Sequence, residues 1–387
     1  MIKLPDQDGK LTAYTPRNAP RERVPADGPF RSRVAVAAAH VVVDPLAANE
    51  PFGTPLVDWD ATLAFRRHLW SEGFVVGEAL DTAQRGMGLD WGLASELIRR
   101  SGAEAAAAGG RLTAGVWTDQ IDPATTDLAA VTAAYEQQLE LVDEAGAQAV
   151  ILSSRQLAAG ATSAEDYAAV YGKLLGNASR PAILHWVGPE WDPALAGYWG
   201  SADPETAMAN FLDIVRANAA KIDGVKVAPL PIEREIELRG KLPEGVRCYT
   251  GDDFSYPQLI AGDGTTHSDA LLGVLDPLAG LAADAIHLLD DGDVEGFRRL
   301  LDPSVELSGH LFKGPGMNIR FYKTGFVFLA WLAGHQSHFR MIWGEQAARS
   351  VPHLARAYQL GDQLGLFPEP ALAEHRMRVI LTTAGLD

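Results

Sequence analysis

The chain has 387 residues, 47% of them hydrophobic, which is enough to bury the core of one large domain or of two ordinary ones. Its 50 acidic and 33 basic residues give a formal net charge of −17, which disfavours binding to nucleic acid or to an anionic membrane surface. The single cysteine, Cys248, excludes an internal disulfide, and neither a signal segment nor a membrane-spanning run is recognised. We therefore expect a soluble, cytoplasmic protein whose partner is a small molecule.

Residues 1–30 form the first predicted segment, a hairpin followed by an arm. Asp8 and Gly9 separate two short apolar-rich runs, which is typical of a tight turn between antiparallel strands. The residues after the second run are rich in proline and arginine and lead into the main domain.

From residue 31 onward, short apolar runs alternate with helical patterns, as in a parallel sheet whose strands are joined by helices. Eight runs are predicted strands, at residues 34–43, 73–77, 112–117, 149–152, 182–187, around 226, 246–249 and 268–274. Eight strand-helix units are the number in a (β/α)8 TIM barrel, whose active site lies at the carboxyl ends of the strands. We therefore predict an α/β fold with such a barrel over residues 31–312.

Residues 313–387 are predicted to be a C-terminal helical extension packed on the barrel. Aromatic residues recur in it near the period of a helix, at Phe321, Tyr322, Phe326, Phe328, Trp331, Phe339 and Trp343. This pattern indicates core or subunit contacts rather than a cofactor site. We expect no cofactor, and we expect some of these residues to be buried in subunit contacts.

Lys226 lies in the sixth predicted strand, after a turn indicated by Asp223 and Gly224 and before Pro229. Poor solvation in an apolar strand would lower the pKa of its ammonium group. Only the neutral amine attacks a carbonyl to form a Schiff base, so this is the environment that an amine nucleophile needs. Taken alone, a lysine of this kind is also compatible with a structural ion pair.

Polar side chains at the other strand ends would meet Lys226 at one mouth of the barrel. These candidates are Glu78 and Asp81 after the second strand, Trp117 after the third, Ser154 after the fourth, His185 in the fifth, Asp252 and Asp253 after the seventh, and Gly273 after the eighth. Carboxylates and hydroxyls suit a polyhydroxylated ligand, and histidine ordinarily has a pKa suited to proton transfer. Each residue also has a structural reading, such as a helix cap or a buried histidine.

The order of four segments resembles the dihydrodipicolinate synthase and N-acetylneuraminate lyase family of Schiff-base aldolases. The segments are Gly77-Glu78-Ala79-Leu80-Asp81, Leu184-His185-Trp186, Gly224-Val225-Lys226 and Gly251-Asp252-Asp253. The resemblance covers residues 34–312 and implies a TIM barrel in which Lys226 forms an imine. It also implies a homodimer or homotetramer, because barrels of this family are often dimers or tetramers. Residues 320–325 and 333–338 are similar to a little-characterised branch of that family, known only as a domain of unknown function.

Two departures from the family bear on the substrate. The family usually carries Gly-Thr-Thr-Gly-Glu after the second strand, where the hydroxyls bind the carboxylate of a 2-oxo acid, but Glu78 and Ala79 stand here. A carboxylate at this place would repel a pyruvyl group. The family's proton-relaying tyrosine in the fifth strand is replaced by His185. The resemblance therefore supports imine chemistry more firmly than it supports pyruvate.

Three hypotheses follow. In the first, the protein is a Schiff-base lyase, either an aldolase or a dehydratase, acting on a keto-sugar, a related polyhydroxy carbonyl compound or a 2-oxo acid. Lys226 forms the imine, His185 moves the proton and the remaining candidates bind substrate, without a metal ion. In the second, a divalent metal ion held by Glu78, Asp81, His185 and Asp252 supports an aldolase or sugar isomerase, although the ligand spacing is not diagnostic. In the third, the barrel binds a sugar metabolite without turning it over.

Overall fold

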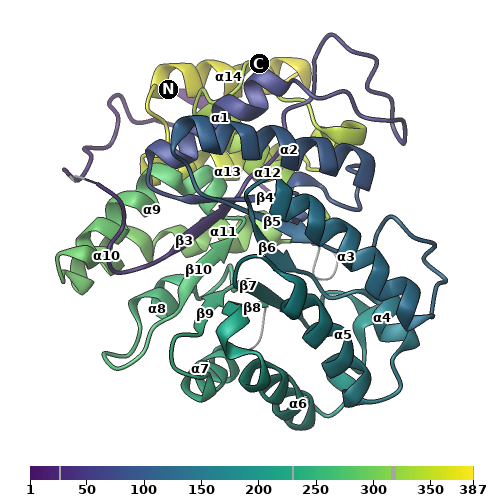
Figure 1. Cartoon of the computed structure of the whole chain (residues 1–387). Coiled ribbons are helices and arrows are strands. Elements are labelled where there is room, and N and C mark those ends of the chain that lie inside the picture. The colour runs from purple at the N-terminus through teal and green to yellow at the C-terminus, as the bar shows by residue number, and fades with distance from the viewer. Residues whose placement is uncertain (26–27, 229–230, 315–319, 387) are drawn as a thin grey trace.

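The computed structural model describes residues 1–25, 28–228, 231–314 and 320–386. Eight parallel strands close into a barrel in the order β10-β3-β4-β5-β6-β7-β8-β9, which confirms the predicted TIM barrel (Figure 1). The barrel strands are β3 (Ala35–Ala38), β4 (Val75–Glu78), β5 (Leu112–Val116), β6 (Gln148–Ile151), β7 (Ala182–Val187), β8 (Ile222–Ala228), β9 (Arg247–Thr250) and β10 (Asp269–Leu272).

Helices join successive strands and surround the barrel. They are α1 (Trp59–Ser71), α2 (Trp91–Ala108), α3 (Leu128–Glu144), α4 (Arg155–Gly160), α5 (Ala164–Asn177), α6 (Pro204–Ala217), α7 (Ile232–Lys241), α8 (Tyr256–Ala261) and α9 (Leu275–Asp290). Four of them begin after an aspartate whose carboxylate accepts a hydrogen bond from a backbone N–H of the first turn, namely Asp58, Asp90, Asp127 and Asp203. Such caps satisfy backbone donors that the helix leaves free.

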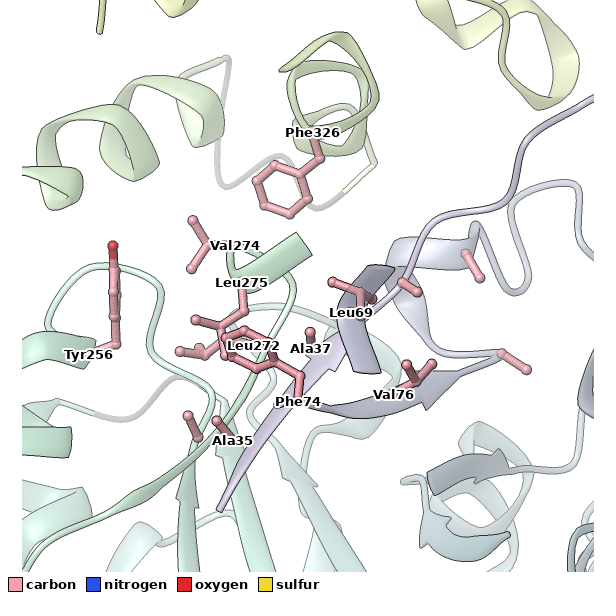
Figure 2. Close-up of a cluster of buried hydrophobic side chains, with 14 of the residues drawn as sticks. Ala35, Ala37, Leu69, Phe74, Val76, Tyr256, Leu272, Val274, Leu275 and Phe326 are labelled. Carbon is pink, nitrogen blue, oxygen red and sulfur yellow. The ribbon is translucent and has the colours of Figure 1, made fainter. Parts of the chain in front are cut away.

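Side chains alternate between the two faces of each strand, and this alternation decides which residues enter the barrel. Ile183 of β7 belongs to the small cluster that fills the barrel interior, whereas Leu184 belongs to the core between sheet and helices. Val225 and Val227 of β8 belong to that outer core as well, so Lys226 between them faces inward. In Figure 2, outward-facing side chains of β3, β4 and β10 form part of this outer core.

The predicted turn at Asp223 and Gly224 is wrong, because both residues lie inside β8. The Asp223 carboxylate accepts hydrogen bonds from Tyr249 and Arg247 of β9, each at 2.6 Å. A Cβ atom on Gly224 would lie 2.6 Å from the Tyr249 ring, so glycine is needed for close packing here. Pairing with β7 and β9 therefore overrides the local turn preference of these residues. Pro229, named with this strand, lies outside the described residues.

The N-terminal hairpin and the C-terminal helices pack on one another. Strands β1 (Ile2–Pro5) and β2 (Leu11–Tyr14) are antiparallel, and the Tyr14 hydroxyl donates to Asp362 at 2.7 Å. Arg378 donates to the Met1 carbonyl at 2.6 Å, so the two termini lie on the same side of the molecule (Figure 1). The helices after the barrel are α10 (Val294–Leu301), α11 (Ser304–Phe312), α12 (Tyr322–Leu332), α13 (Val351–Leu364) and α14 (Pro370–Thr383).

The aromatic residues of α12 are buried within their own chain. Phe326 and Phe328 are fully buried, and Tyr322 and Trp331 are nearly so. They are core residues and do not support the expectation of subunit contacts, so the homodimer or homotetramer stays a prediction for light scattering to test. In the described part of the chain, no helix combines the length and apolarity needed to cross a membrane.

Candidate active site

Lys226 lies on the inner face of β8, near the carboxyl end of the strand, and its side chain is partly buried. Its ammonium group makes no hydrogen bond or ion pair with any residue that the structure describes. Burial lowers the pKa of Lys226, and the charges of Asp253 and Asp81 partly oppose this change. Gly251 leaves room for the side chain, since a Cβ atom there would lie 3.0 Å from the Lys226 Cε.

Asp253 follows β9 and faces the same part of the barrel. Its Oδ1 atom is buried and has no hydrogen-bond partner among the described residues. Burial raises the pKa of Asp253 to about 7, against the opposing charge of Lys226. A carboxyl group that titrates near neutrality and has an open oxygen atom can accept a proton and return it.

His185 is the register partner of Lys226 on β7. Its Nε2 atom is buried without a partner in the described chain. Burial, together with the charge of Lys226, lowers the pKa of His185 well below 6.5. The imidazole is therefore neutral at physiological pH, whereas the sequence led us to expect titration near neutrality.

Asp81 lies at the mouth, in the short helical turn Asp81–Ala83 that follows β4. Its side chain is 47% exposed, and its Oδ2 atom lies 3.2 Å from the ammonium nitrogen of Lys323. The same oxygen accepts a hydrogen bond from the Tyr322 hydroxyl. The sequence pattern places Tyr322 in core or subunit contacts and gives Lys323 no separate role. The one sequence feature that points to these two residues is the segment 320–325, which resembles the little-characterised branch of the family.

Glu78 is not at the mouth. Val75 lies in the barrel interior, so Glu78, three residues later, points outward to the helices. It is fully buried and holds Arg66 of α1 through two hydrogen bonds of 2.8 and 2.9 Å, and it accepts a third from Ser101 of α2 at 2.7 Å. The predictions that it holds substrate hydroxyls and repels a pyruvyl group do not fit this geometry, because its charge is neutralised outside the barrel.

Two other predicted binding residues are committed to local structure. The Asp252 Oδ1 accepts hydrogen bonds from the backbone N–H groups of Phe254 and Ser255, at 2.7 and 3.1 Å, and so holds the turn before α8. The Ser154 Oγ accepts one from the Leu157 N–H at 3.0 Å and caps α4. These are the structural readings that the sequence had left open for such residues.

Trp117 and Gly273 lie at the strand ends where they were expected. Trp117 follows β5, is partly exposed and donates its indole N–H to the Ser153 carbonyl at 2.8 Å. Gly273 follows β10, and a Cβ atom there would lie 2.7 Å from the Thr82 hydroxyl and 3.0 Å from the Phe326 ring. A larger residue at position 273 would therefore push apart the segments that carry Asp81 and Tyr322.

Aromatic side chains adjoin the charged groups. Phe312 stacks on Tyr322 with ring centroids 4.4 Å apart, and it also contacts Phe254, which follows Asp253 directly. Trp191, in the segment after β7, contacts Phe312 from another direction. Apolar rings beside the carboxylates reduce their contact with water and strengthen the electrostatic interactions of the site.

The four side chains named from the sequence as metal ligands do not converge, because Glu78 faces away from the mouth. No other group of three or more histidine, cysteine, aspartate or glutamate residues in the described ranges is arranged to hold a metal ion. The second hypothesis thus has no ligand set in the described chain.

A family model described as "Protein of unknown function (DUF993)" matches residues 2–386. The chain belongs to this family. A search of curated proteins finds no match. This DUF993 member is similar in structure to dihydrodipicolinate synthase from Bacteroides thetaiotaomicron, with a TM-score of 0.64 and 13% identity over 85% of this chain and 99% of the other.

Two further solved structures are similar to this chain in fold. The dihydrodipicolinate synthase from Aquifex aeolicus has a TM-score of 0.63 and 13% identity, over 87% of this chain and 99% of that one. A putative dihydrodipicolinate synthetase from Pseudomonas aeruginosa has a TM-score of 0.64 and 16% identity, over 86% and 99%. At this level of identity the likeness shows that the DUF993 chain has the fold of these proteins.

Proposed function

We propose that the protein is a Schiff-base-forming lyase that acts on a polyhydroxy carbonyl compound, such as a keto-sugar or a sugar-derived 2-oxo acid. The observation that carries the proposal is the Lys226 amine, which is unpaired in the described chain, faces into the barrel and has a lowered pKa. The likeness in fold to dihydrodipicolinate synthases supports the same chemistry.

The reaction begins when the neutral Lys226 amine attacks the carbonyl carbon. The carbonyl oxygen takes up two protons and leaves as water, and the new C=N bond becomes a protonated imine. This imine accepts the electron pair of a neighbouring C–C bond that breaks, or of a C–H bond that loses its proton before a hydroxyl leaves. Hydrolysis of the imine then returns the free lysine.

Two groups can move the proton in these steps. Asp253 has a pKa of about 7 and an open Oδ1, so it both accepts and releases a proton near neutral pH. His185, which the sequence favoured, holds a proton poorly because its pKa is lowered. We therefore propose Asp253 as the principal proton carrier and His185 as a neutral hydrogen-bonding group for the substrate.

A polyhydroxy substrate fits the acceptors at the mouth. The open Oδ1 atoms of Asp253 and Asp81 can each accept a hydrogen bond from a hydroxyl group. To bind the carboxylate of a 2-oxo acid, the site would need two hydroxyl groups after β4. The chain instead has Glu78, which faces outward, and Ala79 at this place. The site therefore favours a ligand with several hydroxyl donors over pyruvate itself.

Reductive trapping tests the proposal. The protein is incubated with a panel of keto-sugars and 2-oxo acids in the presence of cyanoborohydride, and its intact mass and labelled peptide are measured. We expect one adduct, located at Lys226, and none in the Lys226→Met variant. An unchanged mass with every compound contradicts the proposal. An adduct at Lys323, the other buried lysine near the mouth with a lowered pKa, contradicts it as well.

A further inference from the structure

Helix α12 of the C-terminal extension reaches the mouth of the barrel. Its first residue, Tyr322, donates its hydroxyl to the Asp81 Oδ2, and the next residue, Lys323, places its ammonium nitrogen 3.2 Å from the same atom. Tyr322 and Asp81 are 241 positions apart in the chain. The extension thus supplies side chains to a site that the barrel alone would leave incomplete.

Tyr322 and Lys323 both contact the Oδ2 atom of Asp81, and they leave its Oδ1 atom open. No described residue donates a hydrogen bond to the Asp81 Oδ1, and the side chain is 47% exposed. Lys323 is fully buried. A hydroxyl donor and a buried cation on one carboxylate oxygen fix the group in one orientation, because charge-assisted hydrogen bonds are strong and directional. The open oxygen therefore has a defined place at the mouth.

Packing keeps α12 in this position. Phe312 stacks on the Tyr322 ring with an angle of 16° between the planes. Figure 2 shows Phe326 pointing from α12 toward the barrel, where Val274 and Leu275 follow β10. Phe326 is fully buried. Rotation of α12 would expose these rings, so the position of the Tyr322 hydroxyl is set by the hydrophobic core.

We propose that Tyr322 and Lys323 are positioning residues that orient Asp81 to bind a substrate hydroxyl, so that the C-terminal extension makes the site selective for polyhydroxy carbonyl compounds. This inference rests on the proposed Schiff-base function. A compound that lacks the hydroxyl leaves the oriented carboxylate without its donor and loses that interaction. The imine at Lys226 forms with either kind of compound, because it requires only the carbonyl.

Erythrulose and 2-butanone are suitable probes, because they share a four-carbon skeleton and only erythrulose carries hydroxyl groups. The rate of adduct formation at Lys226 is measured against concentration for both compounds. We expect the Tyr322→Phe variant to raise the half-saturating concentration of erythrulose about tenfold and to leave the rate with 2-butanone unchanged. The Lys323→Met variant should behave in the same way.

The matched control is Tyr358→Phe. Tyr358 is a fully buried tyrosine of α13 whose hydroxyl has no partner in the described chain, so the control makes the same substitution away from Asp81. This variant should leave the rate of adduct formation unchanged for both compounds. Equal losses for both compounds in Tyr322→Phe would indicate a general structural effect and overturn the inference, as would no change at all.

A second measurement separates this inference from the function on which it rests. Calorimetry on Lys226→Met, which cannot form an imine, reports the binding of erythrulose alone. Adding Tyr322→Phe should raise the Kd about tenfold, the loss of one hydrogen bond of about 1.4 kcal/mol. If erythrulose binds but forms no adduct with the wild type, the Schiff-base function is overturned, whereas the proposed role of Asp81 in binding a hydroxyl group stands. Absence of binding to Lys226→Met would overturn the hydroxyl site.

Discussion

His185 and Lys226 occupy paired positions on strands β7 and β8, and both side chains enter the barrel. A charge on Lys226 disfavours a second charge on the imidazole, and burial acts in the same direction on the pKa of His185. The imidazole of this pair therefore stays neutral. This relationship supports the proposal that Asp253, whose charge raises the pKa of Lys226, carries the proton in place of the histidine.

Substitution of the two candidate proton carriers should have unequal effects. Asp253→Asn removes a group that titrates near pH 7, so turnover should fall about 10²- to 10⁴-fold while reductive trapping at Lys226 persists. His185→Phe should lower turnover less than about tenfold, because the imidazole is neutral near pH 7 and its lowered pKa makes it a poor proton acceptor. Steady-state kinetics, with circular dichroism to verify folding, measures both. A larger loss of turnover in His185→Phe than in Asp253→Asn would indicate that His185 carries the proton.

The pH dependence of trapping should respond to Asp253. Its negative charge raises the pKa of Lys226, so Asp253→Asn should lower that pKa further. More of the amine is then neutral at a given pH, and the rising limb of the trapping rate should move to lower pH. The control is Asp213→Asn, on the exposed face of α6. A shift to higher pH would show that Asp253 does not act on the lysine as a charge.

Glu78 should prove structural. Glu78→Gln leaves buried Arg66 without its counter-charge, and loss of one partner of a buried ion pair costs about 3–5 kcal/mol of unfolding free energy. The exposed pair of Glu96 and Arg100 offers a comparison, since Glu96→Gln should cost less than about 1 kcal/mol. Chemical denaturation measures both. Unchanged stability with weakened substrate binding would place Glu78 in the site after all.

The packing of the C-terminal extension should weaken in acid. His335 stacks on His68 of α1, and His353 stacks on His310 of α11, each with ring centroids 4.1 Å apart. Burial, with the neighbouring histidine as a further cause, lowers the pKa values of His335 and His353 to about 3.

The sign of the pH effect follows from these values. An unfolded histidine takes up a proton below about pH 6.5, whereas these folded ones do not until about pH 3. The unfolding free energy should therefore fall between these limits, by at most about 1.4 kcal/mol per pH unit for each imidazole and by less where water screens the charge. Denaturation from pH 7 to 4 measures this slope. His335→Phe should reduce it, and His375→Gln, on the exposed face of α14, should not.

The barrel could be predicted because strand and helix patterns are local. Each buried strand is a short apolar run, and eight such runs separated by helical patterns leave few other architectures. The order of strands also put Lys226 and His185 on neighbouring strands. The direction of Glu78 was not predictable in this way, because β4 is buried on both faces and its sequence shows no alternation of polar and apolar residues.

The sequence by itself therefore determined the barrel and the lysine within it, because hydrophobic periodicity and strand order are properties of short segments. Only the tertiary structure decided which polar groups face that lysine. Tyr322 reaches Asp81 because Phe326 and Phe312 pack α12 against the barrel, and that packing joins segments far apart in the chain. The pKa values of His185 and Asp253 depend on the same burial, which no local pattern expresses.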